Sequence, residues 1–167
     1  MIHEEIVNSV TLINYMLKMQ MELDKDIFEN KPCGNFNREN LDLAIVDEVG
    51  ELNHELKALW CWWKETQPSP NSSKVLEELV DVWHFVLMKH YKIYKKDGYS
   101  AEDFVHVLYM GFKYETDHTF IYHFLSTNYE IGDVVALTFA LGFEIEDVYK
   151  EYERKNKINH ERVENGY

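Results

Sequence analysis

The sequence predicts an all-α fold, an antiparallel bundle of helices, and three observations favour it. Apolar residues recur three and four positions apart over several long stretches, which is the spacing of one helix face. No stretch shows the sustained alternation of a half-buried strand. The 167 residues include only 7 glycines and 3 prolines, whereas 46% are hydrophobic. We therefore expect one compact helical domain over residues 1–167.

The first helix is expected over residues 7–28. Four apolar residues lie near one side of this segment: Val10, Ile13, Leu17 and Met21. The Pro-Cys-Gly sequence at 32–34 is typical of a helix end. A second helix is expected from about Arg38, with Asn37 as its N-cap because a short polar side chain can accept from the first backbone N–H groups.

The clearest break in the helical pattern lies at residues 66–72, where two prolines prevent a continuous helix. A third helix is predicted at 74–95, and the Asp-Gly-Tyr sequence at 97–99 closes it. Ser100 and Asp103 are the expected cap of a short helix that follows. Three more helices are expected at 120–125, 130–141 and 145–160, with Gly142 as the stop between the last two.

The formal net charge is −13, which argues against a nucleic-acid partner. Proteins that bind a phosphate backbone do so through clustered Lys and Arg. Cys33 and Cys61 match no metal-binding spacing and form no disulfide framework. No apolar stretch approaches the ~20 residues of a membrane span, and the first residues are acidic where a secretory signal would be basic. The expectation is a cytoplasmic protein without a membrane partner.

Two acidic motifs on apolar helical segments are the most informative feature. Glu48 and Glu51 are three residues apart, and so are Glu78 and Asp81. Residues at this spacing lie one above the other on a helix, so each motif directs two carboxylates the same way. Such carboxylates repel unless a cation lies between them, and Mg²⁺ binds through a few carboxylates, water and phosphate oxygens. The motifs therefore predict a site for metal and phosphate.

A single pair of this kind is more often a solvated helix face, because Glu is a good helix former. The second pair differs, since its neighbours are apolar on most sides: Leu76, Leu79, Val80, Val82, Trp83, Val86 and Leu87. Carboxylates in such surroundings should be coordinated, paired or protonated. Glu55 extends the first column as a ligand or an outer carboxylate, and Glu77 is expected to face solvent. His84, three residues after Asp81, could reach the metals, but a core position is the expectation.

The acidic motifs resemble the metal site of the all-α NTP pyrophosphohydrolases, a superfamily with MazG-like enzymes and dimeric dUTPases. Two further segments resemble the dimeric dUTPases in particular. They are Met-Gln-Met-Glu-Leu-Asp at 19–24 and the segment 152–167, with its Lys-Asn, Asn, Arg and Gly-Tyr series. The resemblance extends over about 12–167 and is weakest at 99–130.

This resemblance implies a bundle of the all-α NTP pyrophosphohydrolase type with additional C-terminal helices. It also implies a homodimer with two or more Mg²⁺ ions in each site, which hydrolyses dUTP, and also dUDP, to dUMP and so limits uracil in DNA. The implied metal ligands are Glu48, Glu51, Glu78 and Asp81. Glu48 or Glu51 is also the catalytic general base, and the spacing does not choose between them.

The same resemblance assigns further residues to the nucleotide. Gln20 and Asn159 read the uracil edge, a task that suits an amide because it both donates and accepts hydrogen bonds. Lys155 and Arg162 hold phosphates, although a lone basic column near a helix end would only compensate the helix dipole. Two more residues are expected in the nucleotide pocket, Asp24 and Asn156, although Asp24 could equally be a simple exposed residue.

The segment Trp-Cys-Trp-Trp-Lys at 60–64 is a dense aromatic cluster beside the expected site. Such a cluster is usually core or dimer interface. The family has an aromatic and basic segment here, although this chain departs from its usual order. The resemblance leaves open whether Lys57 or Lys64 reaches the phosphates and which Trp lines the pocket, and we choose Lys64 and Trp62. A helix continuing to Lys64 would put the acidic motifs about 12 Å out of level. We therefore predict a helix end near 58–60 and a lid over the nucleotide formed by 60–72.

Two alternatives remain open. A MazG-like pyrophosphohydrolase with another base preference would carry the same acidic motifs, although the C-terminal motif speaks against it. The other is a helical interaction protein, since some phage-encoded relatives engage repressors. In that case the aromatic-rich residues 99–130 would contact a phage or host regulatory protein, whereas the simpler interpretation is packing against the bundle.

Overall fold

The computed structural model describes residues 3–30, 36–109 and 119–166. These residues contain eight helices and no strand, which confirms the all-α prediction. The helices are α1 (His3–Asn30), α2 (Arg38–Glu55), α3 (Lys57–Trp60), α4 (Ser72–Lys92), α5 (Ala101–Tyr109), α6 (Phe120–Leu125), α7 (Ile131–Ala140) and α8 (Ile145–Glu164). None of these described helices has the length and apolar character needed to cross a membrane.

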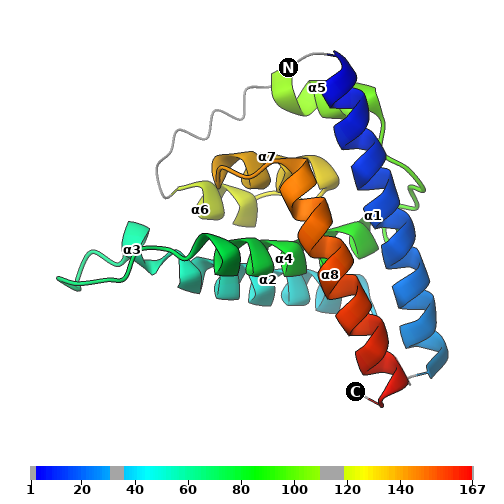
Figure 1. Cartoon of the computed structure of the whole chain (residues 1–167), viewed down its shortest axis with the longest axis horizontal. Helices are drawn as coiled ribbons and strands as arrows, with labels where there is room; N and C mark the ends of the chain where they lie inside the picture. Colours follow the sequence, from blue (N-terminus) through cyan, green and yellow to red (C-terminus); the bar gives the residue numbers. More distant parts are fainter. Residues whose placement is uncertain (1–2, 31–35, 110–118, 167) are drawn as a thin grey trace.

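Two pairs of helices that cross each other position the site (Figure 1). α2 and α4 form an antiparallel hairpin, and α3 lies in the segment that connects them. The second pair is α1 and α8, and α4 contacts both of its members. α7 packs on α4, α6 contacts α2 and α7, and α5 contacts α1 and α7. α4 is therefore the central helix.

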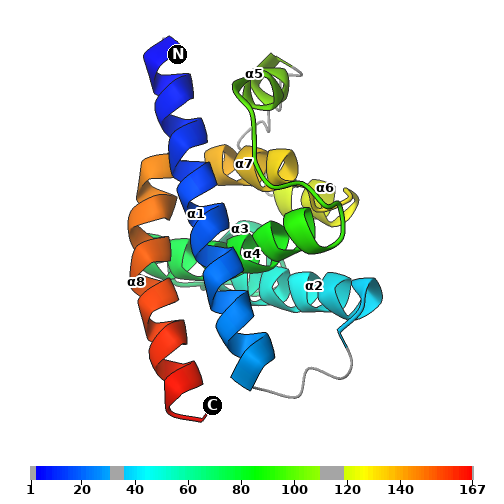
Figure 2. The same cartoon turned by 90° about the vertical axis from the view of Figure 1, so that its right-hand side faces the viewer.

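The expected antiparallel order holds for α2 and α4 but not for α1 and α8. These two helices run in the same direction, from the end near the N-terminus to the end near the C-terminus (Figure 2). A short connection forces neighbouring helices to be antiparallel. α1 and α8 have no such connection, because all the other helices lie between them in the sequence.

The core is built around α4, which is buried on most of its sides as the sequence indicated. A helix that is apolar nearly all round is stable only inside a protein. Trp83 is completely buried, and its indole N–H donates to the Thr138 hydroxyl of α7 at 3.0 Å. Since α4 also carries Glu78 and Asp81, the rigid centre of the molecule supports one of the acidic motifs.

Local capping explains several helix ends that were predicted. The Asn37 side chain accepts from the Asn40 N–H at 2.7 Å and begins α2. Asp103 accepts from the Ser100 N–H at 3.2 Å ahead of α5. Gly142 has a φ of +81°, a left-handed conformation that glycine adopts readily, and it separates α7 from α8. The predicted stop at 32–34 lies outside the described residues.

α2 ends at Glu55, which is earlier than the predicted end at 58–60. After Leu56, α3 forms a single turn, and the Trp60 indole N–H donates back to the Asn53 carbonyl oxygen at 2.9 Å. α4 begins at Ser72 after an irregular connection. The prediction that the second helix breaks early is therefore confirmed, although its exact end was wrong because the local turn at Leu56 was not recognised.

Candidate functional site

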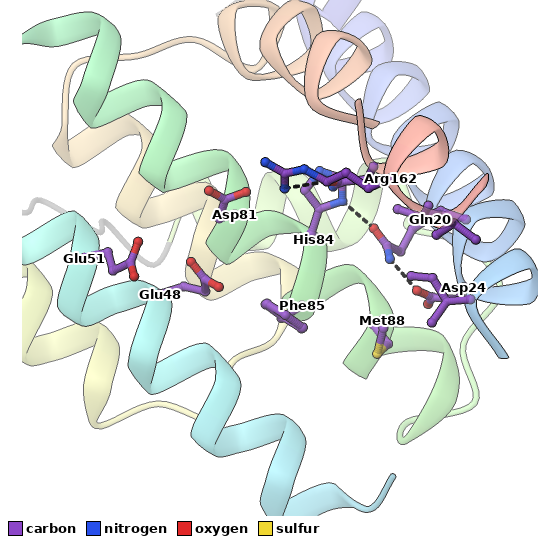
Figure 3. A pocket seen from close by; sticks show the side chains of 13 residues that line it. Gln20, Asp24, Glu48, Glu51, Asp81, His84, Phe85, Met88 and Arg162 are labelled. Atoms are coloured by element: carbon purple, nitrogen blue, oxygen red, sulfur yellow. Dashed lines mark hydrogen bonds between the residues drawn. The ribbon is translucent and has the colours of Figure 1, made fainter. Parts of the chain in front are cut away.

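A cavity of about 490 Å³ opens between α1, α2, α4 and α8 (Figure 3). Carboxylates from α2 and α4 lie at one end of it, and Gln20 and Asp24 of α1 lie at the other. Its lining residues are Gln20, Leu23, Asp24, Ile27, Glu48, Glu51, Asp81, His84, Phe85, Met88, Asn159, Arg162 and Val163. Segments far apart in the sequence thus share one cavity, as the sequence motifs predicted.

The two acidic motifs lie level with each other across the α2–α4 hairpin. One carboxylate oxygen from each of Glu48, Glu78 and Asp81 lies within 4.8 Å of the others. Glu51 is not part of this triad but lines the same cavity one turn further along α2. Glu55 lies beyond it, in a shallow depression that Glu51 and Glu78 also line. The early end of α2 is what permits this alignment.

Burial and mutual repulsion raise the pKa values of these carboxyl groups. Burial raises the pKa of Glu48 to about 7, and the nearby charges of Asp81 and Glu51 add to the effect. Burial and Asp81 raise the pKa of Glu78. Burial also raises the pKa of Asp81, although a hydrogen bond from Lys155 opposes the change. Such a cluster of hard oxygen ligands is suited to a divalent cation, which would relieve the repulsion.

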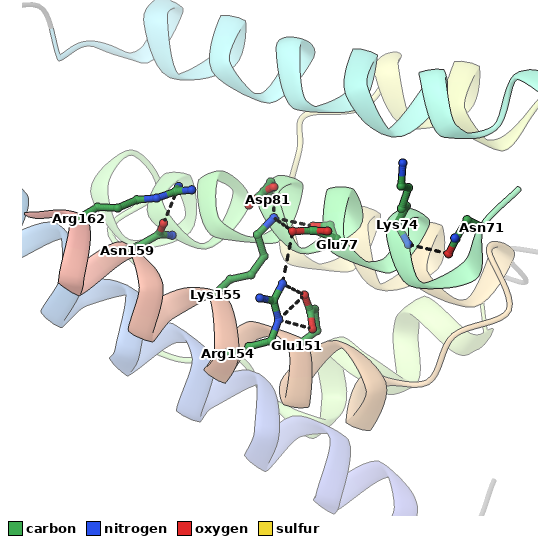
Figure 4. A network of polar contacts seen from close by, with 9 residues as sticks. All are labelled: Asn71, Lys74, Glu77, Asp81, Glu151, Arg154, Lys155, Asn159 and Arg162. Atoms are coloured by element: carbon green, nitrogen blue, oxygen red, sulfur yellow. Dashed lines mark hydrogen bonds and ion pairs between the residues drawn. The ribbon is translucent and has the colours of Figure 1, made fainter. Parts of the chain in front are cut away.

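Basic residues of α8 lie directly on the acidic motif of α4 (Figure 4). The Lys155 ammonium group donates to the Asp81 carboxylate and to the Glu77 carbonyl oxygen, the latter at 3.1 Å. Arg154 pairs with Glu151 at 2.5 Å and with Glu77 at 3.3 Å. The Glu77 side chain remains 45% exposed, in line with its expected solvent-facing position. Lys155 therefore supplies a positive charge beside the carboxylate cluster.

A buried hydrogen-bond network forms the other end of the cavity. The Gln20 amide donates to Asp24 at 2.6 Å. The Gln20 carbonyl oxygen accepts from the Tyr152 hydroxyl at 2.5 Å and lies 2.7 Å from Nδ1 of His84. Asp24 also accepts from the Tyr91 hydroxyl, and burial raises the pKa of Asp24 to about 6. This network joins α1, α4 and α8 at the cavity wall.

His84 combines the expected core position with a place in the cavity wall. It is buried, as expected of a core residue, and its ring stacks on Tyr152 with 4.1 Å between centroids. It nevertheless lines the cavity, as do Phe85 and Met88, which the sequence had not selected. Positions three, four and seven residues after Asp81 share its side of α4. This spacing from Asp81 could have indicated that His84, Phe85 and Met88 also line the cavity.

The C-terminal motif is only partly brought to the cavity. Asn159 and Arg162 line it, and Arg162 donates to the Asn159 carbonyl oxygen at 3.3 Å. Asn156 does not line the cavity. It is 6% exposed, and its amide nitrogen has no hydrogen-bond partner in the part of the chain that the structure describes. The predicted pocket position of Asn156 is therefore not seen in this structure.

The structure does not show the predicted lid. The connection between α2 and α4 extends away from α1 and α8 at the far end of the hairpin (Figure 1). Trp62 is 88% exposed, Lys64 is exposed, and neither lines the cavity. The physical reason is that this segment is the tip of the hairpin, whereas the carboxylates lie in the interior of both helices. The single chain thus brings neither residue to the cavity.

A second cavity, of about 360 Å³, lies near the C-terminal end of α4. It is lined by His90, Lys96, Tyr99, Asp103, His106, Val107, Thr127, Asn128, Glu130, Ile131, Gly132 and Asp133. His90 is 3% exposed, and its Nε2 lies 3.0 Å from the Gly98 carbonyl oxygen. Part of the 99–130 segment that resembled no motif therefore packs here. Its residues 110–118 lie outside the described residues.

The chain was compared with models of known protein families. The family model described as dUTPase matches residues 12–167. The matched range includes both acidic motifs and every other residue that lines the first cavity. A search of curated proteins finds no matching relative.

Proposed function

This chain belongs to the dimeric, all-α dUTPase family and hydrolyses dUTP, and we propose that the first cavity is the site where it does so with Mg²⁺. The observation that supports this assignment is the combination of a carboxylate triad within 4.8 Å with a hydrogen-bonded amide wall in the same cavity. The carboxylate triad suits the binding of a cation with its phosphates, and the amide wall suits the binding of a nucleotide base. The products that we propose are dUMP from dUTP, and also from dUDP.

Glu48, Glu51, Glu78 and Asp81 are the residues that we assign to the metal. Mg²⁺ prefers hard oxygen ligands and completes its coordination with water and phosphate oxygens. Burial first, and repulsion between neighbouring carboxylates second, raises the pKa values of Glu48, Glu78 and Asp81, and a bound divalent cation would favour their ionised forms. The donor set therefore fits the ion, and four carboxylates offer enough oxygens for two or more ions.

When bound, the metal ions neutralise the charge of the phosphates and lower the pKa of water. The residues of the chain position the water and accept its proton. Glu48 and Glu51 face the cavity, and one of them takes the proton of the attacking water as general base. We favour Glu48, which belongs to the carboxylate triad and lines the cavity. Water attack at the β-phosphorus is part of this proposal.

Lys155 and Arg162 are the residues that we assign to the phosphates. Lys155 lies on Asp81, so a phosphate bound at the carboxylate cluster meets an ammonium group already in place. Arg162 lines the cavity and presents a planar set of donors that matches phosphate oxygens. The position of these two cations on α8 explains how so acidic a chain can hold a polyanion.

The deoxyuridine is proposed to lie at the opposite end of the cavity. Phe85 and Met88 supply apolar surface there, and Gln20, Asp24 and Asn159 supply the polar groups. This division into a charged end and a base end matches the two ends of a nucleotide. We also propose that residues 1–167 act as one domain and that the protein works as a homodimer.

A panel of deoxynucleoside triphosphates tests the proposal. The purified protein is incubated with dUTP, dCTP, dTTP and dATP in the presence and absence of Mg²⁺, and released monophosphate is measured. The expected result is Mg²⁺-dependent release of dUMP with a clear preference for dUTP. Equal turnover of dCTP would instead indicate a pyrophosphohydrolase of broader base preference. Turnover without any divalent ion would overturn the metal assignment.

A further inference from the structure

Most of the hydrogen-bonding groups of the Gln20 amide are already bonded within the protein, which leaves too few to read a base edge. Its carbonyl oxygen has two lone pairs, and both are directed to neighbours, to the Tyr152 hydroxyl at 2.5 Å and to His84 at 2.7 Å. One of its two N–H donors is bonded to Asp24. Only one N–H of Gln20 therefore remains for a nucleotide. It can meet a uracil carbonyl oxygen but cannot accept from the uracil N3–H.

This arrangement fixes the tautomer of His84. The Gln20 carbonyl oxygen can only accept, so the facing Nδ1 of His84 must carry the hydrogen. The orientation of the Gln20 amide is itself set by Asp24, an acceptor that needs an N–H. Burial lowers the pKa of His84 to about 3, so the imidazole stays neutral. Nε2 of His84 must then carry a lone pair and act as an acceptor.

Nε2 of His84 has no hydrogen-bond partner among the described residues. His84 is 6% exposed, and its ring is held against Tyr152. An unpaired acceptor in such a place costs about 1–3 kcal/mol, so a partner is expected from outside the protein. Nε2 has almost no exposed surface in this structure, but His84 lines the cavity, so a ligand that enters it and displaces the side chains around the ring can provide that partner.

The position of His84 along the cavity narrows the choice of partner. His84 lies between Asp81, at the carboxylate end, and Gln20, at the base end (Figure 3). Uracil presents an N–H at N3 between two carbonyl groups. Cytosine has a lone pair at N3, which an acceptor would repel. With the base held so that N3 faces the imidazole, the imidazole lone pair and the remaining amide N–H match the N3–H and a carbonyl oxygen of uracil. In the same position cytosine would place its N3 lone pair opposite that of the imidazole.

We propose that Nε2 of His84 accepts the N3–H of uracil and that this contact distinguishes uracil from cytosine. Gln20 then acts mainly as a positioning residue: it holds the tautomer of His84 and donates its remaining N–H to a uracil carbonyl oxygen. The inference rests on the proposed binding of dUTP in this cavity. The sequence suggested that Gln20 reads the uracil edge as both donor and acceptor. In this proposal His84, and not Gln20, accepts the hydrogen bond from uracil.

The variant that tests this is His84→Phe, which keeps a flat ring against Tyr152 and removes both ring nitrogens. The measurement is kcat/KM for dUTP and for dCTP with Mg²⁺, together with the dissociation constants of their α,β-imido analogues. The dUTP to dCTP ratio is expected to fall about tenfold to a hundredfold, which corresponds to one lost hydrogen bond. An unchanged ratio would overturn the role of His84.

The matched control is His90→Phe. His90 lies on the same helix, is equally buried and also has one ring nitrogen without a partner in the described structure, but it lines the second cavity. This variant is expected to keep the ratio of wild type. An equal loss of selectivity in both variants would show that a general disturbance of α4 is responsible and would overturn the inference.

A measurement on the wild-type protein avoids any dependence on the folding of a variant. Nitrogen-15 NMR of the His84 ring should show a protonated Nδ1 and an unprotonated Nε2 without ligand. The imido-dUTP analogue should shift the Nε2 resonance strongly, whereas an analogue with 3-deazauracil, which has C–H in place of N3–H, should not. Equal shifts with both analogues would overturn the contact. Failure to bind or hydrolyse dUTP would instead contradict the proposed function itself.

Discussion

The two cavities along α4 contain similar groups but use them differently. Each contains a buried histidine of α4 with one ring nitrogen bonded and the other unpartnered within the described residues. His84 must carry its hydrogen on Nδ1, facing Gln20, whereas His90 must carry it on Nε2, facing the Gly98 carbonyl. Burial lowers the pKa of both. The histidines alone therefore do not distinguish a substrate site from a structural one.

The carboxylates of the two cavities distinguish the substrate site from the structural one. In the second cavity Asp103 accepts from Ser100, and Asp133 and Glu130 form the capping box of α7. Their oxygens stabilise helix ends that would otherwise have unsatisfied N–H groups. Glu48 lies in the middle of α2 and Glu78 lies in the second turn of α4, beyond the first-turn positions that cap a helix end. Carboxylates gathered away from any helix end indicate a functional cluster.

The largest predicted effect follows from replacing a carboxylate of the first cavity. Glu51→Gln and Asp81→Asn should each lower kcat for dUTP by about a hundredfold to a thousandfold, because charge stabilisation provides most of the catalysis. Steady-state kinetics with Mg²⁺ measures this, and circular dichroism checks the fold. Asp103→Asn is the control and should keep kcat within a few fold. Near-normal turnover of either first-cavity variant would remove the distinction between the cavities.

Replacing a carboxylate of the second cavity is predicted to lower stability and to leave activity unchanged. Asp133→Ala removes the carboxylate that accepts from the Glu130 N–H at 2.8 Å and should lower the free energy of unfolding by about 1 kcal/mol. Urea denaturation measures the loss. The kcat/KM for dUTP should stay the same once the protein is folded. A large loss of activity without a loss of stability would mean that the second cavity takes part in catalysis.

A smaller effect concerns the dependence of stability on pH without metal. Glu48 has a pKa of about 7 in the folded protein, above its ordinary value of 4.5. Between these pH values the unfolded chain has lost the proton while the folded chain retains it, so stability falls as pH rises from 4.5 to 7. Glu48→Gln removes this loss. Its melting temperature at pH 8 should exceed that of wild type by a few degrees.

The comparison that checks this prediction uses thermal melts at pH 4 and pH 8 with a chelator present. The advantage of Glu48→Gln should disappear at pH 4, where Glu48 is protonated in both states. A constant difference between variant and wild type at both pH values would show that the effect is not electrostatic. Added Mg²⁺ should stabilise the wild type more than the variant, since it binds the ionised cluster.

The smallest effect is predicted at the hairpin tip, which lines neither cavity. Trp62 is 88% exposed, so Trp62→Ala should change the free energy of unfolding by less than about 0.5 kcal/mol. The kcat/KM for dUTP should stay within about twofold if the tip has no contact with the nucleotide. An increase in KM of tenfold or more would show that Trp62 reaches a nucleotide after all, as the sequence suggested.

The sequence by itself determined the features that depend on near neighbours in the chain. Apolar spacing predicted the helices, and Asn37 and Gly142 predicted a start and a stop, since caps act over one turn. The pairs at 48/51 and 78/81 predicted carboxylates on one face for the same reason. The match with the dUTPase family over residues 12–167 confirmed the family that the motifs indicated.

Only the tertiary structure decided which of these groups meet. Tyr152 and Gln20 are 132 positions apart, yet their hydrogen bond takes up part of the amide that the motif assigned to uracil. Likewise, the contact of Lys155 with Asp81 depends on the crossing of α8 over α4, and the exposure of Trp62 depends on where the hairpin ends. Periodicity specifies the direction of a side chain around its own helix. It does not specify which helix lies opposite, so partners, tautomers and the limits of the cavity emerged only from packing.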